Sequence, residues 1–219
     1  LLEPDRQFDL SPYCACIEEE LGAWGFSAAV PPRGKTGDSA IESAFLKANT
    51  REQFVEIEAD PELRWSIPGT RRIKIRFEVD TDPPAGFRTE TRFLLQPIPF
   101  SVRVYDPSSL FAGKMHALLC RSWKTRVKGR DWYDFVWYVS RGTKLDLAHL
   151  ESRMRQSGHY DREKALGESN FRQMLADKIA SLDVDDARSE VERFVKDRSS
   201  VQVWSRDFFA AVAEQVSIL

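Results

Sequence analysis

Six basic residues precede two closely spaced aspartates in the middle of the chain. The aspartates are Asp131 and Asp134, and the basic residues are Lys114, Arg121, Lys124, Arg126, Lys128 and Arg130. A nucleoside triphosphate (NTP) or an RNA backbone carries several negative charges, which clustered Lys and Arg side chains neutralise. A segment that only tethered nucleic acid would have continued the basic pattern. The mixture of cations and acids therefore indicates chemistry on a polyanion.

The first part of this segment has helical spacing. Lys114, Leu118 and Arg121 fall on one face of a helix, at intervals of four and three residues. A cation at each end of that face could reach one bound anion. The alternative is a basic face that simply meets solvent.

Asp131 and Asp134 are three residues apart and are neighbours on one face of a helix. Carboxylates this close tend to need a cation or a proton between them. The alternative is structural, with Asp131 capping the helix and Asp134 pairing with Arg130 or a distant arginine. The aromatic residues around them are interpreted as core and interdomain packing and not as a platform for bases. They are Trp132, Tyr133, Phe135, Trp137 and Tyr138.

A second group of acids ends a predicted strand. Between Arg72 and Asp82 apolar and charged residues alternate, so one face of the strand is core and the other is charged. Glu78 and Asp80 on the charged face could hold Mg²⁺, which takes oxygen ligands and usually one or two carboxylates together with substrate phosphates. The alternative is again a face that meets solvent.

The histidines and cysteines do not form a recognisable metal motif in the sequence. His116, His149 and His159 are each interpreted as isolated surface or hydrogen-bonded residues. The Cys14-x-Cys16 pair has no second cluster to complete a zinc site, and Cys120 leaves an odd thiol. An odd number of cysteines favours a reducing compartment.

Length and composition limit the possible classes of protein. The chain has 219 residues, of which 42% are hydrophobic, which is ample for a buried core. Its 32 basic and 34 acidic residues nearly cancel, so any anion-binding surface must be local. No apolar run approaches the ~20 residues of a membrane span, and the start lacks the pattern of a signal peptide. We therefore expect a soluble, cytoplasmic protein that does not bind membranes.

The elements that must position these residues are mainly predicted strands in the first half of the chain and predicted helices in the second. The sequence predicts an α+β fold, with a partial α/β domain over residues 1–106 built on a small mixed sheet and a helical bundle over residues 107–219. The first part contains a helix over Ser11–Trp24 and strands over Phe26–Val30, Ile41–Leu46, Gln53–Glu58, Arg72–Asp80 and Ile98–Tyr105. From Ser108 apolar spacing of three and four residues predicts helices, including Leu147–Gln156, Arg162–Ala180, Asp185–Val195 and Ser205–Val216.

The central segment resembles a known family. Lys114-Met-His-Ala-Leu-Leu-Cys-Arg121, followed by Lys128-Gly-Arg-Asp-Trp-Tyr-Asp-Phe135, is similar to the lysine and Arg-Asp-x-Tyr-Asp motifs of the AbiEii/AbiGii toxin family. That family belongs to the nucleotidyltransferase-like superfamily. The start of the chain and the strand ending at Asp80 stand where the order of the family would put them. The similarity runs from Leu1 to about Val139. Beyond that residue only the general helical pattern of the sequence is similar.

The resemblance implies a two-domain toxin of bacterial toxin–antitoxin or abortive-infection systems. Its sheet would bind NTP and Mg²⁺, with Glu78 or Asp80 as the late carboxylate, and its helical domain would supply Lys114 to the phosphates and Asp131 as an acid across the cleft. Arg121, Lys124, Arg130 and Asp134 would support them. The implied reaction moves a nucleotide from NTP to an RNA acceptor such as tRNA, and the implied partners include a cognate antitoxin.

One motif of the family is missing from these residues. The family begins with a Gly-Gly or Gly-Ser helix start and an Asp-x-Asp pair on the next strand, and Leu1 stands where that motif would have ended. Those acids hold the metal in nucleotidyl transfer. We therefore expect the full-length form to be active and this chain to be weak or inactive. The alternative function is a non-catalytic protein that binds RNA, a nucleotide or a protein through the same basic surface.

Overall fold

The computed structural model describes residues 11–24, 28–29, 50–58, 72–80, 82–121, 127–161 and 163–219, with most residues of the first three strands described by their backbone alone. The chain divides into two compact units, Leu1–Pro83 and Pro84–Leu219. Helices and antiparallel strands occur together, so the predicted α+β class is confirmed. The assignment of residues 1–106 and 107–219 to separate domains remains a prediction.

The described part of the first unit is a helix and three strands. The helix α1 spans Ser11–Ala23, and the antiparallel sheet has the order β1-β2-β3, with strands Ala28–Ala29, Thr50–Glu58 and Arg72–Asp80. The predicted strand Ile41–Leu46 lies outside the described residues. The described strand pairs of this sheet are antiparallel. The predicted mixed sheet would therefore need a parallel strand outside the described residues. The register sets Glu52 opposite Glu78.

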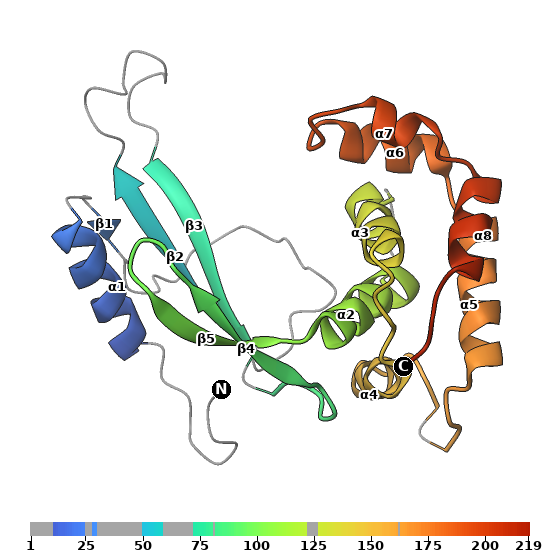
Figure 1. Cartoon of the computed structure of the whole chain (residues 1–219), viewed down its shortest axis with the longest axis horizontal. Coiled ribbons are helices and arrows are strands. Elements are labelled where there is room, and N and C mark those ends of the chain that lie inside the picture. Colours follow the sequence, from blue (N-terminus) through green and yellow to red (C-terminus); the bar gives the residue numbers. More distant parts are fainter. Residues whose placement is uncertain are drawn as a thin grey trace. The chain divides into compact units, whose positions relative to one another are not determined.

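The second unit begins with a hairpin and continues in helices (Figure 1). Within it α5 and α8 lie side by side, while α2 packs on α3 and α4, and α3 packs on α6. None of the helices in the described parts of the chain is both long and apolar enough to cross a lipid bilayer. The elements are β4 Thr89–Leu94, β5 Phe100–Tyr105, α2 Pro107–Cys120, α3 Gly129–Ser140, α4 Leu147–Gln156, α5 Glu168–Ala180, α6 Val184–Glu192, α7 Ser199–Gln202 and α8 Arg206–Glu214.

Aromatic and aliphatic side chains from all the long helices of this unit form one core. Phe111 stacks on Tyr138 with a centroid distance of 5.0 Å, and Trp132 and Trp204 both contact the Phe209 ring. The predicted packing role of Trp132 is thus confirmed. The fully buried side chains of this core include Phe111, Met115, Phe135, Leu150, Met154, Phe171, Leu175 and Phe209.

A network around Arg88 holds the hairpin to the helices. Its guanidinium Nε lies 3.0 Å from Asp106 Oδ2 and 3.7 Å from Asp146 Oδ2, and its backbone N–H donates to Ser109 Oγ. Asp106 and Asp146 also cap α2 and α4, by accepting from Ser109 N and His149 N. One arginine therefore links the starts of two helices.

The segment Ser217–Leu219 returns to the loop between α3 and α4. Leu145 N–H donates to Ser217 O at 2.8 Å, and Leu219 N–H donates to Leu145 O at 3.0 Å. These bonds form an isolated parallel bridge between Leu145 and Ile218. Because Leu145 is fully buried, the bridge ties this segment into the core.

Candidate anion-binding site

A cleft of about 750 Å³ opens in the second unit beside α2 and α3. Five cations and three carboxylates line it, so it is charged but not uniformly basic. The described residues around it are Lys114, Arg121, Lys128, Arg130, Asp131, Tyr133, Asp134, Val191, Phe194, Val195, Lys196, Asp197 and Ser200. The cleft therefore gathers four of the six cations that the sequence analysis singled out, together with both aspartates, while Lys124 and Arg126 lie outside the described residues.

Lys114 and Asp134 form an ion pair in this cleft. Lys114 Nζ on α2 lies 2.5 Å from Asp134 Oδ2 on α3, and both side chains are partly exposed. The predicted alternative partner of Asp134, an arginine, is not the one that the structure shows. The Lys114 side chain is about half exposed, so a phosphate that enters the cleft could replace the Asp134 carboxylate as the partner of its ammonium group.

Asp131 lies deeper than Asp134 and is held differently. Its carboxylate is 12% exposed and lies 3.8 Å from an Arg121 guanidinium nitrogen. Burial raises the pKa of Asp131 above its usual value, while the charges of Arg121, Lys128 and Lys114 oppose that rise. Asp131 also borders a neighbouring hollow of about 200 Å³. A buried carboxyl with a raised pKa between two hollows suits proton transfer better than a surface acid does.

The capping alternative for Asp131 is wrong. The residue before the first turn of α3 is Lys128, whose side chain makes no capping bond, and Asp131 lies inside the helix. The backbone N–H groups at this end are instead taken by carboxylates of α6. Val127 N–H donates to Asp186 Oδ2 at 2.7 Å, and Arg130 N–H donates to Glu190 Oε2 at 3.1 Å. Sequence reasoning missed both acids because they lie about sixty residues away.

Arg130 is fixed by the same helix. Its Nε donates to Glu190 Oε1 at 3.2 Å, and its guanidinium lies 4.6 Å from the centre of the Phe194 ring. Glu190 is 7% exposed, so most of its environment is protein. Arg130 thus connects α3 to α6 beside the cleft, and its predicted supporting role at the site remains a prediction.

Glu190→Ala is expected to lower the free energy of unfolding. Two donors of Arg130 would lose their acceptor, and because this side chain is half exposed and water can replace the carboxylate, we expect a loss of about 1 kcal/mol. Chemical denaturation followed by circular dichroism would measure the loss. Glu214→Ala, at an exposed position on α8, is the control and should change stability little. Equal stability of the Glu190 variant and the parent would show that the contact with α6 is unimportant.

The far wall of the cleft was not predicted. Phe194, Lys196 and Ser200 come from the segment around the end of α6 and α7, and Phe194 is 55% exposed. Tyr133 is 37% exposed and lines the cleft, although the sequence placed it in packing. The run Arg193-Phe194-Val195-Lys196 was the available signal, because it sets two apolar residues between two basic ones.

The remaining predicted site residues are not among the described residues that line this cleft. Lys124 lies outside the described residues, as does the side chain of Glu78. Asp80 is exposed at the end of β3, and its Oδ1 accepts from Asp82 N–H at 3.1 Å. Glu78 and Asp80 belong to the first unit and the cleft to the second, so their predicted meeting in one pocket remains a prediction.

The interpretation of His116 and His159 as isolated residues is wrong. Their side chains and that of Cys120 each offer a ligand atom, and these atoms lie within 4.8 Å of one another. His116 and Cys120 are four residues apart on α2, which is a usable ligand spacing on a helix. Only His159 is distant in sequence.

The α+β chain thus carries a cleft in which cations and paired acids lie together, and these are the groups that phosphate-handling proteins use. The family comparison gives this class a name: the chain belongs to the family described as nucleotidyl transferase AbiEii toxin, type IV toxin–antitoxin system, whose sequence model matches residues 11–214. The match covers the helical remainder as well as the motifs around Lys114 and Asp131. Neither a curated protein nor a solved structure shows a significant match. The family implies an NTP substrate, a divalent metal and an antitoxin counterpart.

Proposed function

We propose that this protein transfers a nucleotide from NTP to an RNA acceptor such as tRNA, and that the α2–α3 cleft contacts phosphate and acceptor. The observation that carries the proposal is that one cleft gathers Lys114, Arg121 and Asp131 from separate turns of two helices. Family membership supplies the reaction class, and the charges of the cleft support a polyanionic ligand.

Lys114 and Arg121 are the proposed phosphate contacts. In nucleotidyl transfer, catalysis depends mainly on positioning and on neutralising the charge of the transferred group. Lys114 is already held in the cleft by Asp134, so its ammonium is oriented before a ligand arrives. Arg121, which is near Asp131, offers a planar set of donors suited to phosphate oxygens. Lys128 and Lys196 add positive charge around them.

Asp131 is the proposed base for the acceptor hydroxyl. Its raised pKa makes it a better proton acceptor than an ordinary surface aspartate. The cations that oppose the rise are Arg121, Lys128 and Lys114. The proton would pass from the acceptor oxygen to a carboxylate oxygen of Asp131.

Aromatic side chains at the mouth of the cleft support a nucleic-acid acceptor. Tyr133 and Phe194 are both partly exposed, and the Arg130 guanidinium covers the Phe194 ring. Exposed rings and guanidinium planes beside a basic groove are the features on which unpaired bases stack. A single-stranded RNA end is therefore the acceptor that we propose.

Glu78 and Asp80 are the proposed ligands of Mg²⁺. The fit rests on the chemistry of the donors, because carboxylate oxygens suit this ion and the Asp80 carboxylate is exposed, with one oxygen already bonded to Asp82 N–H. When bound, the ion would neutralise the charge that develops on the phosphates. The register partner of Glu78 is Glu52, a third acidic residue of this sheet.

Lys114→Ala tests the phosphate contact. We expect calorimetric titration of this chain with ATP to show about tenfold weaker binding, because a charge-assisted hydrogen bond to phosphate contributes about 1.5–3 kcal/mol. Transfer of labelled nucleotide to total tRNA by the full-length form should fall by about 10²–10³-fold.

Lys144→Ala is the matched control, since Lys144 is exposed and does not line the cleft. It removes the same charge and should leave binding and transfer unchanged. Equal ATP affinity of the parent and the Lys114 variant would contradict the phosphate role. Absence of transfer to RNA with intact ATP binding would contradict the RNA acceptor and leave nucleotide binding standing.

A further inference from the structure

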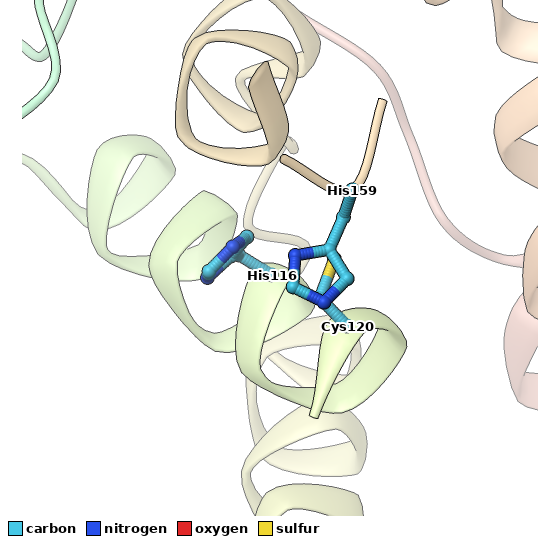
Figure 2. Close-up of side chains that lie close together, drawn as sticks. All are labelled: His116, Cys120 and His159. Atoms are coloured by element: carbon cyan, nitrogen blue, oxygen red, sulfur yellow. The ribbon is translucent and has the colours of Figure 1, made fainter. Parts of the chain in front are cut away.

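The side chains of His116, Cys120 and His159 form a cluster apart from the basic cleft (Figure 2). His116 and Cys120 lie on successive turns of α2, and His159 comes from the segment after α4. All three ligand atoms lie within 4.8 Å of one another. Ligands on a shared tetrahedral ion lie about 3.3–3.8 Å apart. The set is therefore somewhat wider than a metal-bound one, and His159 is its exposed member.

We propose that His116, Cys120 and His159 bind a transition-metal ion, with Zn²⁺ the best match. Two imidazole nitrogens and one thiolate are the nitrogen and sulfur ligands that Zn²⁺ takes, whereas Mg²⁺ prefers oxygen. Three protein ligands leave a fourth position for water. Since His116 and Cys120 are buried and His159 is exposed, the ion would enter from the side of His159.

Ser157 supports the two imidazoles. Its Oγ lies 2.8 Å from His116 Nε2 and 2.9 Å from His159 Nδ1, and its hydroxyl donates to Met154 O. With its own proton given to Met154, the oxygen can accept an N–H from each ring. Metal-binding histidines typically donate one ring N–H in this way and bind the ion through the other nitrogen. Ser157 is therefore a positioning residue for both ligands.

The metal would act on structure and not on the transfer reaction. Lys114 faces Asp134 of α3, whereas His116 bonds Ser157 after α4. An ion on His116, Cys120 and His159 would therefore pin the segment after α4 to α2. Because α2 also carries Lys114 and ends next to Arg121, the ion would hold that helix in place without touching the substrate.

Zinc titration of the metal-free chain tests the proposal. We expect one ion per chain by calorimetry, a melting temperature that rises with the zinc concentration, and thiolate-to-metal absorption when Co²⁺ replaces Zn²⁺. Cys120→Ala should remove the absorption band, and His159→Gln should weaken binding at least tenfold. Ser157→Ala should weaken it by about 10–100-fold.

The controls separate this site from other thiols and from misfolding. Cys16→Ser changes an exposed cysteine of α1 and should leave zinc binding intact. His159 is exposed, so His159→Gln keeps the test valid even where Cys120→Ala fails to fold. No zinc binding by the parent would overturn the proposal. Unchanged binding by His159→Gln, or loss of binding in Cys16→Ser, would also overturn it, because the ion would then lie elsewhere.

Discussion

Asp131→Asn is expected to lower nucleotide transfer by about 10²–10⁴-fold, the range for removal of a positioned general base. Asparagine keeps the size of the side chain and its place beside Arg121, but it cannot take a proton from the acceptor hydroxyl. Single-turnover transfer of labelled nucleotide to tRNA by the full-length form would measure the loss. Binding of ATP by this chain should change much less, because the proposed phosphate contacts are Lys114 and Arg121.

The same substitution should raise the free energy of unfolding at neutral pH. Burial places the pKa of Asp131 higher in the folded protein than in the unfolded chain. Between those two pKa values the folded protein binds more protons, so its stability falls as the pH rises through that window. Asparagine does not ionise and avoids this loss. At neutral pH the Asp131→Asn variant should therefore have a higher melting temperature than the parent. The difference between the two melting temperatures should be smaller at acidic pH.

Asp207→Asn, at an exposed position on α8, is the control for both measurements. It should leave transfer unchanged and move the melting temperature little. A fully active Asp131→Asn variant would rule out the base. A variant that is less stable than the parent at neutral pH would mean that the pairing of Asp131 with Arg121 outweighs the cost of its burial.

Gly129→Ala is expected to destabilise the second unit by about 3 kcal/mol, near the upper end for overpacking. A Cβ at this position would lie 1.8 Å from the Ala187 carbonyl oxygen and 3.2 Å from Val191 Cβ. The obstacle is mainly backbone, so α3 and α6 would have to separate. Arg130 and Asp131 follow directly on α3, and the cleft would lose its geometry together with the packing.

Gly113→Ala gives a matched comparison within α2. A Cβ there meets only the Arg153 side chain at 3.7 Å, an ordinary contact, and alanine favours a helix over glycine by roughly 0.5–1 kcal/mol. The midpoint of denaturant unfolding should therefore fall below that of the parent for Gly129→Ala and rise above it for Gly113→Ala. A Gly129 variant as stable as the parent would show that α3 and α6 can adjust without loss.

The elements that were predicted best are those with local signals. α4 has the predicted bounds because Asp146 caps its start and its apolar spacing is regular. α5 begins at Glu168 and not at Arg162, because Gly167 precedes the helix in an extended conformation. Two elements were missed. β4 alternates poorly between apolar and polar residues, and α7 has four residues, too few to display a helical period.

The candidate site was predicted as far as one segment of sequence could show it. Lys114, Arg121 and Asp131 were found because their types and spacing lie within a single run of the chain. Asp186, Glu190 and Phe194 complete the surroundings from α6 and beyond, and no local pattern ties them to α3. Likewise the four-residue spacing of His116 and Cys120 was visible, but His159 joins them only through the packing of α2 on α4.

The bridge between Leu145 and Ile218 has a consequence for biosynthesis. Leu145 cannot form its native backbone bonds until Ser217–Leu219 has left the ribosomal exit tunnel. The native backbone bonds of the loop before α4 can therefore form only after α5 to α8 have been translated.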